Sequence, residues 1–166
     1  MTRIQNTLNF LSMYLRLNSE TIQNDGALQG MICVMVRDCL GGGGAEIGMA
    51  TIRGDEDKDY IAAEMIHKTE ETSYDTVITV AEAWVVTQAS GDKITCRPSE
   101  SPDRTEAVIT SVHLNIDFKP CIITAIQPMI RNGEDASLDK PHLTLATGDE
   151  IAGRFSGFVK NLCPIT

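Results

Sequence analysis

The sequence has few basic residues, few aromatic residues and no long apolar run. Its 166 residues include 14 Lys and Arg against 23 Asp and Glu, which gives a formal net charge of −9 at pH 7. Proteins that wrap nucleic acid or lie on an anionic membrane need a positive surface, so we expect neither partner. Only 5% of the residues are aromatic, and no stripe of alternating basic and aromatic residues suggests binding to single-stranded nucleic acid.

No stretch approaches the roughly 18 consecutive apolar residues that would span a bilayer. Polar residues interrupt the apolar ones throughout residues 1–20, and no small-residue cleavage site follows an apolar core. These residues therefore do not resemble a signal peptide. Hydrophobic residues make up 42% of the chain and the mean hydropathy is −0.08, as in ordinary globular proteins. We expect a cytoplasmic protein.

The cysteines form no C-x-x-C pair, and their number is odd. An odd set without paired spacing favours reduced thiols over a disulfide framework. A chain of this length buries enough surface to fold without disulfides or a metal. We expect one domain over residues 1–166. The five cysteines are Cys33, Cys39, Cys96, Cys121 and Cys163.

Hydrophobic periodicity predicts two helices, over residues 3–17 and 56–72. Thr2 is a suitable N-cap for the first helix. The apolar residues of the first helix follow the spacing of one helical face: Ile4, Leu8, Leu11 and Leu15. The inner face of the second helix is made by Ile61, Ala62, Met65, Ile66 and Thr69.

Short apolar or alternating runs predict the strands. The run 76–87 is almost entirely apolar or β-branched, so we expect a central strand with both faces covered. A short connection between the strands 105–116 and 121–130 predicts a hairpin. Further strands are expected at 31–36, at 49–53 and, from a weak alternation, at 142–147. The order of elements predicts an α+β fold, with an antiparallel or mixed sheet of about four to six strands and two helices packed on one face.

Several catalytic and metal-binding patterns are incomplete. The glycines at 41–44 lack the Gly-Lys-[Ser/Thr] of a phosphate loop and predict a mobile loop. The sequence Glu64-Met65-Ile66-His67 has an E-x-x-H spacing, but no second copy completes a di-metal site. The three histidines, His67, His113 and His142, accompany no G-x-S-x-G motif. We therefore expect no cofactor and no metal.

The most distinctive residues are Ala81-Glu82-Ala83-Trp84, followed by the nine residues from Pro98 to Glu106, PSESPDRTE. A strand that carries [S/A]-E-A-W, followed by P-S-E-x-P-D-R-x-E, resembles a group of uncharacterised microbial proteins. The resemblance covers about residues 57–115. It implies an α+β fold, and it implies no activity, because none is established for that group.

The same segment contains the candidate pocket. Glu82 shares a strand face with Val80 and Trp84, and a carboxylate among apolar neighbours requires a cation or takes up a proton. Arg97 and Arg104 are the candidate cations. In one interpretation these residues only tie the loop to the sheet and Trp84 fills the core. In the other they line a polar pocket that consists of Glu82, Trp84, Arg97, Glu100, Asp103 and Arg104.

Two functions follow from these patterns. The first is a non-catalytic interaction domain, expected to form a homo-oligomer because two helices leave apolar strand residues uncovered. The alternative is a small-ligand-binding protein or hydrolase-like enzyme that uses the polar pocket.

Overall fold

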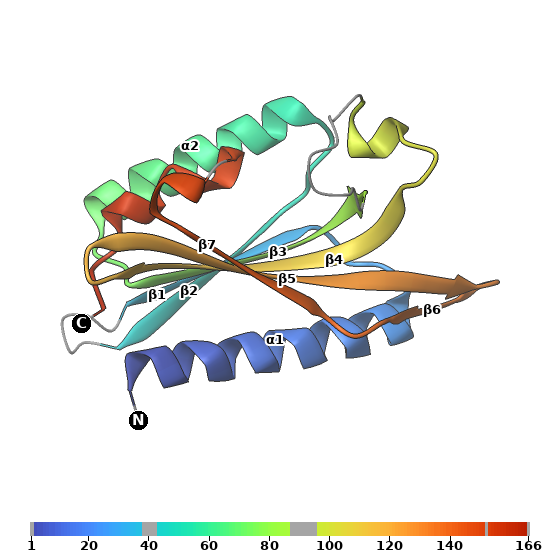
Figure 1. Ribbon diagram of the computed structural model, residues 1–166, viewed down its shortest axis with the longest axis horizontal. Coiled ribbons are helices and arrows are strands. Elements are labelled where there is room, and N and C mark those ends of the chain that lie inside the picture. Colours follow the sequence, from blue (N-terminus) through green and yellow to red (C-terminus); the bar gives the residue numbers. More distant parts are fainter. Residues whose placement is uncertain (1, 38–42, 87–95, 152, 166) are drawn as a thin grey trace.

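The structure is a computed structural model that describes residues 2–37, 43–86, 96–151 and 153–165. It confirms the α+β class, with two long α-helices and a seven-stranded antiparallel sheet (Figure 1). Three features discussed above lie partly or wholly outside the described residues: the thiol of Cys39, the glycine run and the end of the predicted strand 76–87.

The elements follow one another as a helix, two strands, a second helix and five further strands. The helices are α1 (Arg3–Asp25) and α2 (Asp55–Glu71). The strands are β1 (Met31–Arg37), β2 (Gly44–Ala50), β3 (Thr76–Val85), β4 (Thr105–Ile116), β5 (Lys119–Asn132), β6 (Asp135–Leu138) and β7 (His142–Thr147). Short 3₁₀ turns are η1 (Pro98–Glu100), η2 (Gly148–Glu150), η3 (Arg154–Ser156) and η4 (Val159–Asn161). None of the described helices combines the length and apolar character that crossing a membrane requires.

The strand order in the sheet is β2-β1-β3-β4-β5-β6, and β7 also pairs with β5. β5 is long enough to pair with β7 over residues 121–126 and with β6 over 129–132. Pro128, which has no N–H to donate, lies between these two stretches. β4 and β5 form the predicted hairpin around Asp117 and Phe118, both with positive φ, as a two-residue hairpin turn requires. β3 lies inside the sheet as predicted, between β1 and β4.

The two helices lie on opposite faces of the sheet, not on one face as the sequence predicts (Figure 1). Successive residues of a strand point to opposite faces. Val34 of β1 packs in the core with Leu11 and Ile22 of α1, whereas the next residue, Met35, packs with Met65 of α2. The central strands are apolar on both faces, so each face needs its own cover. We call these the α1 face and the α2 face.

Helix α1 is longer than the predicted 3–17 and covers most of its face. Thr2 caps its start by accepting a hydrogen bond from the Gln5 N–H at 3.2 Å, as predicted. The helix ends at Gly26, whose φ of 74° and N–H bond to the Ile22 carbonyl make a left-handed C-cap. The apolar spacing ends near residue 17 because the next inward position is Asn18, a polar residue.

A buried amide network joins α1 to the sheet. Asn18 Nδ2 donates to Thr110 Oγ1 at 2.9 Å and lies 3.4 Å from Gln127 Oε1. Gln127 Nε2 donates back to the Leu15 carbonyl and to Ser19 Oγ, at 3.4 and 3.3 Å. Asn18, Thr110 and Gln127 are all buried. A buried polar group without a partner is costly, so these reciprocal bonds fix the position of α1 on β4 and β5.

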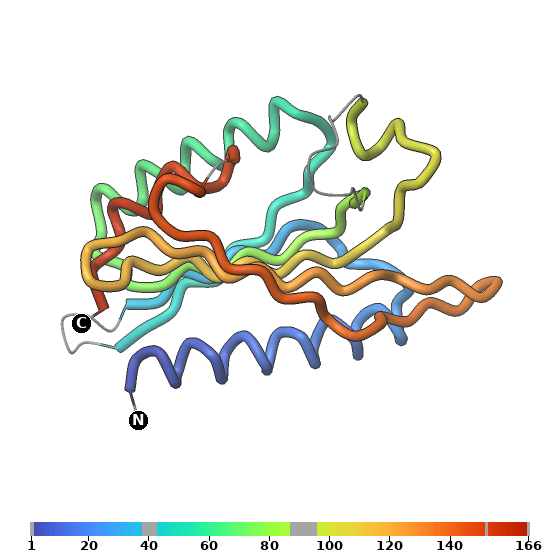
Figure 2. Tube along the Cα trace, in the orientation of Figure 1, coloured from blue at the N-terminus to red at the C-terminus, as the bar shows by residue number. Residues whose placement is uncertain are grey.

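The C-terminal segment shares the α2 face with α2 (Figure 2). Phe158, Val159 and Leu162 are buried there with Met65 and Val77. Main-chain hydrogen bonds hold the segment: Cys163 N–H donates to the Tyr74 carbonyl and Ile165 N–H to the Asn115 carbonyl, both at 2.7 Å. This apolar cluster lies over the start of β3 and the end of β4. Beside this cluster, a cleft opens over the later part of β3 and the earlier part of β4.

Candidate functional site

A cleft of about 830 Å³ opens on the α2 face, beside the covered part. Its floor is formed by β3 and β4. Its walls come from the start of α2, from the segment around η1 and from η3. These walls are far apart in sequence and meet only because the sheet brings the end of β3 beside the start of β4.

The floor of the cleft carries three polar side chains, Thr79, Ser111 and His113, beside the apolar Ala81, Ala83 and Ile109. Thr79 pairs with Ser111 across β3 and β4, and His113 is the next residue of β4 on the same face. The Thr79 hydroxyl lies 3.3 Å from His113 Nε2, and the Ser111 hydroxyl lies 3.3 Å from that of Thr124. The central strands of a sheet normally place apolar side chains on a buried face. Here they carry two hydroxyls and an imidazole at the point where the apolar cover ends.

His113 is buried and neutral. It is only 3% exposed, and its ring centroid lies 4.9 Å from that of Phe158. Burial lowers the pKa of His113 from its ordinary value of 6.5 to about 3, because a desolvated imidazole resists taking a charge. Its Nδ1 has no hydrogen-bond partner among the described residues. This unpartnered nitrogen is buried beneath the floor of the cleft.

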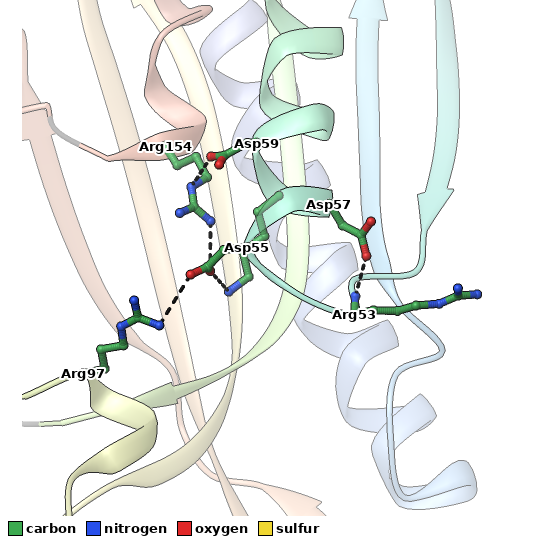
Figure 3. Close-up of polar contacts among 7 residues, drawn as sticks. Arg53, Asp55, Asp57, Asp59, Arg97 and Arg154 are labelled. Atoms are coloured by element: carbon green, nitrogen blue, oxygen red, sulfur yellow. Dashed lines mark hydrogen bonds and ion pairs between the residues drawn. The ribbon is translucent and has the colours of Figure 1, made fainter.

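The rim of the cleft is built around Asp55, the first residue of α2 (Figure 3). Three cations surround its carboxylate. Lys58 Nζ lies 3.4 Å away, one helical turn later. Arg154 Nη1 approaches from η3 at 3.3 Å, and Arg97 Nη1 approaches from just before η1 at 3.5 Å. One side chain thus links the helix to two segments that are distant in the sequence.

Asp59 completes the contacts of Arg154, because its Oδ1 lies 2.9 Å from Arg154 Nε. The hydrogen bond from Arg154, followed by the one from Lys58, holds the pKa of Asp55 below its ordinary value of 3.8. Arg53 also lines the cleft, but its guanidinium extends away from Asp55 (Figure 3). Its main-chain N–H donates to Asp57 at 2.8 Å.

Cations outnumber carboxylates in the cleft. The side chains in contact at its rim are three cations, Lys58, Arg97 and Arg154, and two carboxylates, Asp55 and Asp59. The whole chain has the opposite balance, with 14 basic against 23 acidic residues. The cleft is therefore a locally positive site on an acidic protein.

The structure places three of the six predicted pocket residues beside the cleft, Glu82, Trp84 and Arg97, but Glu82 and Trp84 alternate with Ala81 and Ala83 on β3, so their side chains point to the α1 face. The carboxylate of Glu82 accepts a hydrogen bond from the main-chain N–H of Leu28, between α1 and β1. Arg97, one of its two predicted partners, contacts Asp55 instead. Trp84 is 43% exposed and does not fill the core.

The other three predicted residues, Glu100, Asp103 and Arg104, are not among the residues that line the cleft. The Arg104 guanidinium lies over the Trp84 ring, 4.7 Å from its centroid, and also donates to the Ser99 carbonyl. Glu100 accepts a bond from the Arg97 N–H at 3.3 Å, and Asp103 N–H donates to Ser101 Oγ at 3.3 Å. These contacts stabilise the connection between β3 and β4.

The sequence interpretation missed Asp55, Lys58 and Arg154, and it gave His113 no place in the candidate pocket. Three acidic residues in the first turn of α2 suit a helix N-terminus, so they carry no separate signal for a site. Thr79 and Ser111 could have been noticed in the sequence, because each is a polar residue within a predicted strand. The sequence alone does not show that the two residues lie on the same face of the sheet.

No metal centre is formed by the described part of the chain. Residues 2–37, 43–86, 96–151 and 153–165 contain no group of three or more His, Cys, Asp or Glu side chains placed to hold an ion. In the E-x-x-H stripe, exposed His67 contacts exposed Glu71 at 3.3 Å. Four cysteines, Cys33, Cys96, Cys121 and Cys163, are free thiols.

Comparison of the chain with protein-family models, with curated proteins and with solved structures finds no match. The function must therefore be argued from the cleft itself.

The burial of His113 predicts a pH-dependent stability. The unfolded chain protonates His113 below about pH 6.5, whereas the folded protein keeps it neutral down to about pH 3. Between these values the unfolded state binds more protons, so the free energy of unfolding falls as the pH falls, by up to about 1.4 kcal/mol per pH unit. We expect denaturant unfolding between pH 6.5 and 5 to show this slope, and the His113→Gln variant to lose most of it.

His142→Gln is the matched control, because His142 is exposed and its removal should leave the slope unchanged. Equal slopes for the wild type and His113→Gln in this range would contradict the burial of a neutral imidazole.

Proposed function

We propose that the protein is a small-ligand-binding domain whose ligand occupies the cleft on the α2 face. The observation that carries the proposal is the polar floor of the cleft, where Thr79, Ser111 and His113 replace the apolar residues of a covered sheet. The volume of about 830 Å³ falls within the range of about 300–1,000 Å³ that is typical of small-molecule sites. Polar groups that converge on such a space provide orientation and specificity for a ligand.

The geometry favours binding over hydrolysis. Among the described residues of the floor, the Thr79 hydroxyl and His113 Nε2 form the one hydroxyl–imidazole contact, at 3.3 Å. A base in this role needs a pKa near the working pH and a third group that orients it. The pKa of His113 is about 3, and its Nδ1 has no partner among the described residues. This pair therefore lacks both features of an activated nucleophile.

The free thiols support a further proposal, that the protein works in the reducing cytoplasm. We also propose that the chain belongs with the microbial proteins that share its two motifs. In this chain, both motifs contribute to the cleft: Ala81 and Ala83 come from the first, and Pro98 and Ser99 from the second.

Filling the cleft should abolish ligand binding. Ala81 lies on the floor, so Ala81→Leu places a larger side chain in the space that a ligand would use. We expect a thermal-shift screen of metabolites to find compounds that raise the melting temperature of the wild type and have no effect on Ala81→Leu.

The matched control is Ala146→Leu on β7, a residue of the same sheet that does not line the cleft; it should respond as the wild type does. Compounds that stabilise Ala81→Leu and the wild type equally would place the ligand elsewhere, and a screen without any hit would contradict the proposal.

Self-association is a second candidate function, favoured by the exposed edge strand β2. β2 pairs only with β1 and forms one edge of the sheet. Its Ile47 and Met49 are 70% and 62% exposed. An uncovered apolar edge strand is a template for pairing with another chain. A second copy that added its own β2 would extend the sheet and cover these side chains.

A charge on β2 should prevent this association. Light scattering coupled to size exclusion should report a dimer or larger assembly for the wild type and a monomer for Ile47→Lys. Phe118→Lys at the β4–β5 turn is the control, since Phe118 is also exposed, at 76%, but does not lie on an edge strand. A wild-type protein that remains monomeric at high concentration would contradict this second function.

A further inference from the structure

We infer that the ligand of the cleft is a small organic anion, whose carboxylate or phosphate group is bound by Lys58, Arg97 and Arg154. The inference rests on the proposed ligand-binding function and adds the chemical class of the ligand. It follows from the charges of the rim, from the geometry of the ion pairs and from the polar floor.

The charges on the rim are unusual for this chain. In a protein with a net charge of −9, three cations from three separate segments converge on one point (Figure 3). Asp55 and Asp59 are the carboxylates that contact them. Three cations against two carboxylates leave an excess of positive charge, which would attract an anion and hold it at the mouth of the cleft.

The cations retain donors for a ligand. A guanidinium has five N–H donors, and charge-assisted bonds are about 2.7–2.9 Å long. Arg97 Nη1 lies 3.5 Å from Asp55, and Lys58 Nζ lies 3.4 Å from it. These contacts are longer than such bonds. A carboxylate or phosphate has several acceptor oxygens and could therefore make shorter bonds to Arg97 and Lys58 without displacing Asp55 from α2.

The floor indicates the other end of the ligand. Beyond the rim, the cleft is lined by the hydroxyls of Thr79 and Ser111 and by His113. His113 is only 3% exposed and supports this floor from below, so the half-buried Ser111 is the polar floor residue that a ligand would reach. A ligand that fits both regions has an anionic head at the rim and hydroxyl or carbonyl groups on its body, as in a hydroxy acid or a sugar phosphate.

A substitution of Asp55 distinguishes an anion-binding rim from a purely structural one. Its carboxylate has the charge of the proposed ligand head and contacts the same three cations. It therefore competes with the ligand as well as holding the rim together. If the rim binds an anion, Asp55→Asn should strengthen binding, because it removes the competing charge. If the rim is only a structural link between segments, the same substitution should weaken any binding by loosening the walls.

The experiment measures binding of defined probes to the full chain by NMR titration. Inorganic phosphate and succinate separate phosphate from carboxylate recognition, glucose 6-phosphate adds a hydroxylated body, and glucose is the neutral counterpart. We expect glucose 6-phosphate or succinate to shift the resonances of Ala81, Ala83 and Ser111 on the floor. The affinity should fall on raising the salt concentration.

The variants locate the anionic group. Arg97→Gln and Arg154→Gln should each weaken binding of the anion about tenfold, the effect of losing one charge-assisted bond. Arg16→Gln is the matched control: it removes the same charge from α1, on the opposite face, where Arg16 pairs with Glu20. It should leave the affinity unchanged, and Asp55→Asn should tighten it.

The outcomes separate the inference from the proposed function. Glucose or another neutral compound that binds at the floor, with no binding of the three anions, would overturn the anionic class and leave the ligand-binding function standing. If Arg16→Gln and Arg97→Gln weaken binding of the anion equally, the effect comes from the overall charge of the protein. That result would overturn the proposed site at the rim. If no anion shifts the floor and no compound stabilises the wild type in the screen, both the inference and the function fail.

Discussion

The architecture depends on the unequal covering of the two faces of one antiparallel sheet. Helix α1 packs on β4 and β5 on the α1 face, where Asn18 bonds to the sheet through Thr110. On the α2 face, the apolar cluster of α2 and the C-terminal segment ends near His113. Beyond that point the strand residues of this face, among them Ser111, Ala81 and Ile109, line the cleft. The cleft is the direct result of a sheet that extends past its cover.

Local periodicity predicted most of the fold. The apolar runs located both helices and the strands β1, β3, β4, β5 and β7, because burial acts on each element through its own spacing of residues. Other features depend on partners. The sequence placed the second strand at 49–53, but pairing with β1 fixes β2 at Gly44–Ala50. The four residues of β6 extend β5 and were not predicted. The face on which each helix packs also depends on long-range pairing. The prediction that both helices pack on one face of the sheet was wrong.

The site was predictable only where its residues are close in sequence. Glu82, Trp84 and Arg97 were singled out as a group, and all three border the cleft, although the side chains of Glu82 and Trp84 point to the other face of β3. Asp55 and Arg154 are 99 positions apart, and in the sequence each resembles an ordinary surface charge. They meet because three separate elements reach the same rim: the start of α2, the segment just before η1, and η3. No local sequence pattern encodes this meeting. The expected Glu82–arginine pair is replaced by two other contacts, Glu82 with Leu28 and Arg97 with Asp55.

The central claim, that one face of β4 is open where the other is closed, is tested most directly by cysteine labelling at two adjacent residues. Ser111 lines the cleft, whereas Thr110 is buried beneath α1. In Ser111→Cys and Thr110→Cys, alkylation followed by peptide-resolved mass spectrometry measures the access of reagent to each face. The account predicts that the thiol at 111 reacts at least about tenfold faster than the one at 110, since thiol reactivity follows exposure. Equal protection at both positions would show that the α2 face is closed and would contradict the account.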